Sequence, residues 1–386
     1  MTAPFALLAG RVFDGEVFLS DRAVVVRDGL IADLTPAPPA GLRTVRLPAG
    51  AILAPGFVDV QVNGGGGVLL NDDPSPAAIA RIAAAHRRVG GTTALLPTLI
   101  SDTRPAISAA IAGVAAAIAA GVPGILGLHL EGPFLSPQRP GIHDPARLIP
   151  FGPGDADLLT GLGDRGLTLI TLAPEAVPPG TVAALKARGA RVCAGHTADD
   201  GSALRRALDE GLDGVTHLFN AMSQLGPREA GAVGVALAEP RLFAGIIADG
   251  HHVGDAQLAI ARRLKGPERL MLVTDAMSPV GDPDERRTFS LFGRTIHRDG
   301  NRLASADGTL AGAALTMAGA VRHMSTRGGA SLAEALTMAA LTPARFLGLD
   351  GRMGRIAPGY AADLVALDAG LDVLGTVIGG DGDLAV

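Results

Sequence analysis

The chain has 386 residues, a formal net charge of −5, 48% hydrophobic residues and one cysteine. The charge excludes the basic footprint of a nucleic-acid-binding protein, and a lone cysteine, Cys193, excludes an intrachain disulfide. Gly, Pro and charged residues interrupt every apolar stretch before it could span a bilayer, and the N-terminus has no basic segment followed by a long apolar one. We therefore expect a cytoplasmic protein without nucleic-acid or membrane partners.

Both ends of the chain have sequences typical of short β-strands. Short β-branched runs separated by Asp-Gly and Pro, which are typical of hairpins, occur in residues 7–15, 23–34 and 44–55. Residues 354–370 predict two further strands with a Pro-Gly turn between them. Because neither end could form a core alone, we expect both to join in one small β-sandwich domain made of residues 1–54 and 349–386.

Between them, residues 55–348 alternate apolar runs with Ala-, Leu- and Arg-rich segments of helical length. The predicted strands cover residues 56–63, 92–99, 125–132, 167–174, 191–197, 215–220, 242–249 and 270–277. Eight such units favour a (β/α)8 barrel over the alternative, a doubly wound open sheet. After the last strand we expect a hairpin over 287–305, helices resuming at Gly312 and a final helix ending near Gly348.

Polar side chains gather at the carboxyl ends of these strands, where a barrel builds its active site. They are Asp59, Gln61, Asn63, His129, Glu131, His196, His217, Asn220, Asp249 and Asp275. A lone histidine is more often a hydrogen-bonded core residue. Two histidines at the ends of strands joined by a helix, however, come to the same edge of the sheet.

Glu131, His196 and His217 therefore predict a metal site. One carboxylate and two imidazoles suit Zn²⁺ or another borderline divalent ion, and they leave a position for water. His129 lies on the same face of its strand as Glu131, and we place it beside the ligands rather than among them. Asp275 follows a run of apolar residues at the end of the last strand, so we interpret it as a general base and acid rather than a salt-bridge partner.

The chain resembles a known family at this level of detail. The segments that carry the resemblance, in order along the chain, are APGFVDVQVNG, HLEGPF, GIHDP, AGHT, THLFNAM, GIIADGHHV, LVTDAM, GTLAGAALTM and GRIAPGYAADLVALD. They are similar to the successive blocks of the N-acetylglucosamine-6-phosphate deacetylase family, in the amidohydrolase superfamily. The resemblance implies a barrel with a small β-sandwich, one catalytic metal ion and hydrolysis of the acetamide of a phosphorylated amino sugar.

The resemblance also implies roles for individual residues. Glu131, His196 and His217 would bind the metal and Asp275 would be the base. His143 would contact the acetamide carbonyl, although it could instead cap its loop. The phosphate would be held by Asn220, Ala221, His252 and Arg228, of which Arg228 could instead be a solvated loop charge. Residues lining the bound substrate would include Ile142, Leu310, Ala311 and Gly312.

The sequence also departs from much of the superfamily. Many relatives carry His-x-His on the first barrel strand, where this chain has Gln61 and Asn63, which we interpret as beside the ligands or as a vestigial second site. Neutral amides are poor ligands for a transition metal, so we expect one ion per chain, most simply Zn²⁺, with Fe, Mn or Co as alternatives. His251 is a second departure, without an assigned role.

Several alternatives stay open. The substrate could be N-acetylgalactosamine 6-phosphate, or the chain could be an aminoacylase or a dihydroorotase-like enzyme, or a binding protein that has lost the chemistry. The resemblance further implies a homodimer in which Arg228 reaches the neighbouring subunit's site.

Overall fold

The terminal segments form one β-domain in this computed structural model, which describes residues 3–384. Its strands are β1 (Phe5–Phe13), β2 (Phe18–Arg27), β3 (Leu30–Thr35), β4 (Arg43–Arg46), β5 (Ile52–Pro55), β20 (Leu364–Leu367), β21 (Val373–Ile378) and β22 (Asp381–Leu384). They form an eight-stranded sheet in the order β22-β21-β20-β5-β1-β2-β3, with β4 paired to β1. Because β20 pairs antiparallel with β5, the predicted union of the two termini is confirmed.

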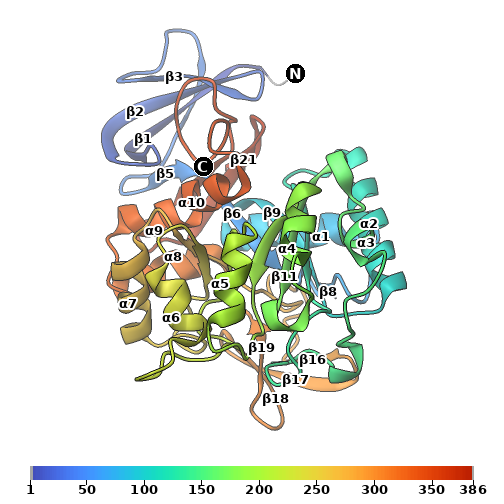
Figure 1. Cartoon of the computed structure of the whole chain (residues 1–386). Helices are drawn as coiled ribbons and strands as arrows, with labels where there is room; N and C mark the ends of the chain where they lie inside the picture. Colours follow the sequence, from blue (N-terminus) through green and yellow to red (C-terminus); the bar gives the residue numbers. More distant parts are fainter. Residues whose placement is uncertain (1–2, 385–386) are drawn as a thin grey trace.

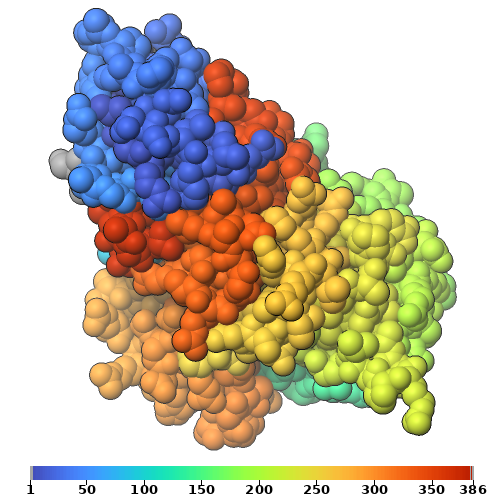
Figure 2. Space-filling model, turned by 90° about the vertical axis from the view of Figure 1, so that its left-hand side faces the viewer, coloured from blue at the N-terminus to red at the C-terminus, as the bar shows by residue number. Residues whose placement is uncertain are grey.

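This β-domain has its own hydrophobic cluster, distinct from the larger core of the barrel. The N-terminal strands and the C-terminal segment lie against each other at one end of the molecule (Figures 1 and 2). The predicted boundaries at residues 54/55 and 348/349 stay a prediction, which limited proteolysis would test.

The barrel contains the eight predicted strands. They are β6 (Phe57–Val62), β9 (Thr92–Ile100), β10 (Gly127–Glu131), β11 (Leu167–Leu172), β12 (Arg191–Ala194), β13 (Gly214–Val215), β14 (Phe243–Ile246) and β15 (Leu270–Leu272). They run parallel in the order β15-β14-β13-β12-β11-β10-β9-β6. A parallel bridge between Val62 and Ala276 joins the first strand to the segment after the last one and closes the barrel.

Helices surround this sheet (Figure 1). They are α1 (Pro76–Gly90), α2 (Arg104–Ala119), α3 (Asp155–Leu159), α4 (Thr181–Ala187), α5 (Ser202–Asp209), α6 (Gly231–Ala238), α7 (Asp255–Lys265), α8 (Met317–Thr326), α9 (Leu332–Ala339) and α10 (Leu341–Leu347), with short 3-10 turns at Pro145–Arg147, Gly163–Arg165 and Pro174–Ala176. Local sequence explains their ends. Ser75 caps α1 by accepting a hydrogen bond from the amide of Ala78, a proline follows it, and Gly91 ends the helix with φ 71°.

The structure corrects two expectations about the elements after β15. Helices do not resume at Gly312, because Leu310–Ala313 forms β19, the last strand of an antiparallel sheet with β16 (Thr288–Leu291), β17 (Arg294–Asp299) and β18 (Arg302–Ser305). The next helix begins at Met317. Residues 354–370 contain one strand, β20, rather than two, because Pro358 and the positive-φ Gly354 and Gly359 keep the first half in turns.

The β16–β19 sheet lies at the opposite end of the barrel from the terminal β-domain (Figure 1). It packs on a third hydrophobic cluster that includes Ile100, Ile142 and Met277. A hairpin of β7 (Gly64–Gly65) and β8 (Val68–Leu69) follows β6. Among residues 3–384, no helix combines the length and apolar character that a bilayer crossing needs.

Candidate active site

Three buried side chains meet at the carboxyl ends of β10, β12 and β13. Oε1 of Glu131 lies 3.1 Å from Nε2 of His196 and 2.9 Å from Nε2 of His217, and the two ring nitrogens are 3.0 Å apart. The histidines hold the pKa of Glu131 well below its usual range, although burial acts in the opposite direction. Burial also opposes protonation of His217, but the adjacent carboxylate outweighs it and raises the pKa of that ring.

This donor set fits a divalent cation. Ligand atoms about 2.0–2.1 Å from a tetrahedral zinc ion lie roughly 3.3–3.4 Å apart, close to the spacing of the three donors. His196 is oriented for that role because its Nδ1–H donates to the carbonyl of Arg139, at 2.9 Å, so Nε2 is the ring atom that would face a cation. His143 also offers a ring nitrogen within 4.8 Å of the donor atoms of Glu131 and His196.

The strands predicted to contain His196 and His217 are longer than the observed ones, so the backbone at both histidines is not extended. The strands end at Ala194 and Val215, two residues before each histidine. His196 has φ 48° and His217 has φ 34°, so both side chains project from left-handed turns rather than from extended backbone. Non-glycine residues rarely hold this conformation, and where they do it is often at a functional site.

His143 is held as a neutral hydrogen-bond donor. Its Nδ1 accepts the backbone N–H of Ser101 at 3.3 Å and lies 2.8 Å from the Ser101 hydroxyl, so the ring proton is on Nε2. Burial, with the neighbouring His196, lowers the pKa of His143 to about 3. The ring therefore stays uncharged at neutral pH and can donate one hydrogen bond from Nε2.

Asp275 is half-buried beside the cluster, three residues beyond β15. Its Oδ1 accepts hydrogen bonds from Nδ2 of Asn63 at 2.7 Å and from Nε2 of Gln61 at 3.1 Å. Burial, followed by the charge of Glu131, raises the pKa of Asp275 to about 6. The carboxylate is thus poised near neutrality, as a general base requires.

His252 lies on the other side of the site, fixed by Asp249. Nδ1 of His252 donates to Oδ2 of Asp249 at 2.7 Å, while the other oxygen of that carboxylate accepts the backbone amides of His251 and His252. The second ring nitrogen of His252 is therefore left available for a ligand. His251 contributes its backbone to this turn, and its side chain is exposed.

These residues surround one cavity of about 450 Å³. The predicted residues that line it are Asn63, Glu131, Ile142, His143, His196, His217, Asn220, Ala221, His252, Asp275, Leu310 and Gly312. Three other predicted residues, Gln61, His129 and Ala311, are buried behind its wall. His129 bonds through Nε2 to the hydroxyl of Thr171 at 2.8 Å, and burial lowers its pKa to about 4.

Arg228 does not join the site within one chain. It is exposed in the loop before α6, and among residues 3–384 it makes no hydrogen bond or ion pair of its side chain. The cavity walls include three other polar residues that sequence reasoning missed, Gln138, Arg139 and Thr309. The available signal was the position of Gln138 and Arg139 between the HLEGPF and GIHDP segments, and of Thr309 within GTLAGAALTM. Asp249, named in the sequence analysis without a role, holds His252 in place.

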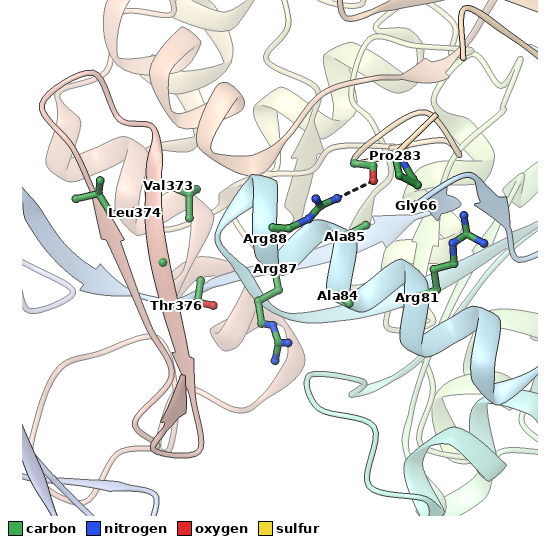
Figure 3. A pocket seen from close by; sticks show the side chains of 12 residues that line it. Gly66, Arg81, Ala84, Ala85, Arg87, Arg88, Pro283, Val373, Leu374 and Thr376 are labelled. Carbon is green, nitrogen blue, oxygen red and sulfur yellow. Dashed lines mark hydrogen bonds between the residues drawn. The ribbon is translucent and has the colours of Figure 1, made fainter. Parts of the chain in front are cut away.

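A second cavity, of about 590 Å³, lies between α1 and β21 (Figure 3). Arg81, Arg87 and Arg88 line it, and Arg88 donates to the carbonyl of Gly281 at 2.9 Å. None of the predicted metal, catalytic or substrate residues contacts this cavity. In Figure 3 the side chains of Arg87 and Arg88 point to different sides, so the arginines do not converge on one point.

A parallel barrel with a Glu/His/His cluster and an aspartate at its strand ends is typical of metal-dependent hydrolases. The model of the amidohydrolase family matches residues 52–384, and the chain belongs to that family. The predicted family resemblance and barrel fold are thereby confirmed, and the chain is a hydrolytic enzyme.

The chain is similar over almost its full length to characterised relatives. It is 43% identical to N-acetylgalactosamine-6-phosphate deacetylase from Shewanella sp. (strain ANA-3), covering 93% of this chain and 91% of the relative. It is 32% identical to N-acetylglucosamine-6-phosphate deacetylase from Haemophilus influenzae, covering 97% and 98%. The crystal structure of N-acetylglucosamine-6-phosphate deacetylase from Pasteurella multocida superposes with a TM-score of 0.94 at 30% identity, covering 99% of this chain and 100% of that one.

Proposed function

We propose that the chain hydrolyses the acetamide of N-acetyl-D-glucosamine 6-phosphate, giving D-glucosamine 6-phosphate and acetate in amino-sugar catabolism. The observation that carries the proposal is the meeting of Glu131, His196, His217, His143 and Asp275 on one cavity. Relatives named as deacetylases of this substrate class match nearly the whole chain. A catalytically inert relative would have no reason to keep these buried polar groups together.

Glu131, His196 and His217 would hold one divalent ion, for which we propose Zn²⁺, with Fe, Mn or Co as alternatives. When bound, the ion supplies Lewis acidity, which polarises the amide carbonyl and lowers the pKa of water. Gln61 and Asn63 direct amide nitrogens, which do not ligate metals, toward the carboxylates. This supports a single ion per chain.

Asp275 would take the proton of the attacking water and deliver it to the amine nitrogen as the C–N bond breaks, so one side chain serves as base and then as acid. The neutral Nε2–H of His143 would donate to the carbonyl oxygen and stabilise the negative charge that develops there. Leu310, Ala311 and Gly312 would enclose the acetyl group, together with Ile142.

The phosphate would bind at the His252 end of the cavity, with Asn220 and Ala221. Within one chain His252 is the imidazole at that end, and Arg228 lies outside the cavity. We therefore propose a homodimer in which Arg228 reaches the partner's site. We also propose that the enzyme is cytoplasmic.

N-acetylgalactosamine 6-phosphate is the second candidate substrate, favoured by the 43% identity to a deacetylase of that sugar. The test is acetate release by metal-loaded protein from both 6-phosphorylated epimers and from both unphosphorylated sugars. We expect kcat/KM to be highest for a phosphorylated sugar, and the ratio between the epimers identifies the substrate. Equal rates with and without phosphate would contradict the proposal.

A further inference from the structure

Gln61 and Asn63 contact the base directly. The two side chains point to the same face of β6, and both donate to Oδ1 of Asp275, at 3.1 Å and 2.7 Å. The nitrogen of Gln61 also donates to Oε2 of Glu131 at 3.0 Å. The two hydrogens of one amide thus bridge the proposed base and the proposed cation ligand.

The contacts determine which way each amide faces. A carbonyl oxygen of Gln61 in this position would face two carboxylate oxygens without a shared proton, so the nitrogen must occupy it. The same argument applies to Asn63 and Asp275. Both amides therefore direct their nitrogen atoms into the site, as hydrogen-bond donors and not as metal ligands.

Backbone hydrogen bonds hold Gln61 and Asn63 beside Asp275. The amide of Asp275 donates to the carbonyl of Gln61 at 3.1 Å, and the amide of Asn63 donates to the carbonyl of Ala276 at 2.9 Å. One layer deeper, Asp59 accepts the backbone N–H of Gln61 at 3.1 Å and the hydroxyl of Thr274. Asp59, Gln61, Asn63 and Thr274 are buried and Asp275 is half-buried, so bulk water has little access to these bonds.

We propose that Gln61 and Asn63 are positioning residues that occupy Oδ1 of Asp275, so that Oδ2 alone takes the proton from water and returns it to the departing amine. The inference rests on the proposed function, because it assigns the geometry of that proton transfer. Gln61 additionally fixes the base relative to the cation site through Glu131. The pair is thus a working part of a single-metal site and not the remains of a second one.

The test compares Asn63→Leu and Gln61→Met, which remove the donors at nearly constant volume, with the surface control Gln257→Met on α7. We expect kcat to fall about 10- to 100-fold in each of the two site variants, KM to change less than about 3-fold, and dialysed protein to keep its metal content and thermal midpoint. Gln257→Met should match the parent. Loss of metal, or a raised KM with normal kcat, would overturn the positioning role.

A double-mutant cycle with Asp275→Asn separates positioning from independent effects. If Asn63 acts through Asp275, Asn63→Leu should cost less than about 3-fold in the residual kcat of the Asp275→Asn enzyme. Equal costs in both backgrounds would refute the inference while leaving the deacetylase activity intact. Absence of acetate release by the parent protein would instead refute the proposed function itself. If Gln61→Met does not fold, Asn63→Leu alone decides the outcome.

Discussion

Replacing Asp275 with Asn tests the proposed base with little disturbance of the structure. The amide oxygen of the new side chain can accept the bonds that Asn63 and Gln61 now donate to Oδ1. No buried donor is left unpaired, so we expect folding and metal content to be preserved. What is lost is the ability to accept a proton, and general acid–base groups contribute at least about 10²-fold to kcat, or about 2.7 kcal/mol.

The assay is steady-state acetate release, together with metal analysis of the same protein. The proposed mechanism needs the ionised carboxylate, so kcat/KM of the parent enzyme should fall as the pH drops through about 6, the value to which burial and Glu131 raise the pKa of Asp275. Asp275→Asn should lose both the rate and this acid limb. Near-normal turnover by metal-loaded Asp275→Asn would refute the reasoning.

Three further predictions concern the phosphate, the metal and stability. Arg228→Ala should raise KM for the phosphorylated sugar by an amount worth about 1.5–3 kcal/mol, with little effect on the unphosphorylated sugar; equal losses would indicate a structural role. Elemental analysis of dialysed protein should give about one transition metal ion per chain, and His196→Asn or His217→Asn should abolish metal and activity; two tightly held, essential ions would contradict this. Burial raises the pKa of Asp59 to about 7, above its ordinary 3.8. The contribution of Asp59 to stability is therefore present at low pH and is lost as the pH rises through about 7. Asp59→Asn should flatten the pH dependence of the thermal unfolding midpoint.

Much of the barrel could be predicted from sequence because largely apolar runs alternate with segments of helical length. Glu131 ends β10, and His196 and His217 lie two residues beyond the ends of β12 and β13. The ends of the strands in a barrel necessarily meet. The resemblance then supplied roles that no pattern encodes, such as that of His143. The tautomer of His143 depends on Ser101, whose backbone N–H lies 42 residues away in the chain.

Other features depended on contacts that periodicity does not report. Leu310–Ala313 consists of small and apolar residues, which suit a helix or a strand. It becomes β19 because Gly312, with φ 56°, lets this backbone approach Asp275, where a Cβ atom would lie 2.5 Å from the carbonyl oxygen. The strand ends near His196 and His217 were misplaced because both histidines have positive φ values, 48° and 34°, which an apolar run in the sequence does not reveal.

The location of the proposed base, Asp275, follows from how the barrel closes. β6 and β15 are the two edges of the parallel sheet. Among residues 3–384 they are joined by a single bridge, by backbone bonds between residues 61–64 and 275–276, and by side-chain bonds of Thr274 and Asp275 to the first strand. Because no regular ladder constrains the backbone there, Asp275 can adopt φ 49° and turn its carboxylate inward. The side chains of Gln61 and Asn63 then donate to one oxygen of this carboxylate. The contacts that close the barrel therefore also orient the proposed base. A substitution that weakens the Asp59–Thr274 contact should lower kcat as well as stability.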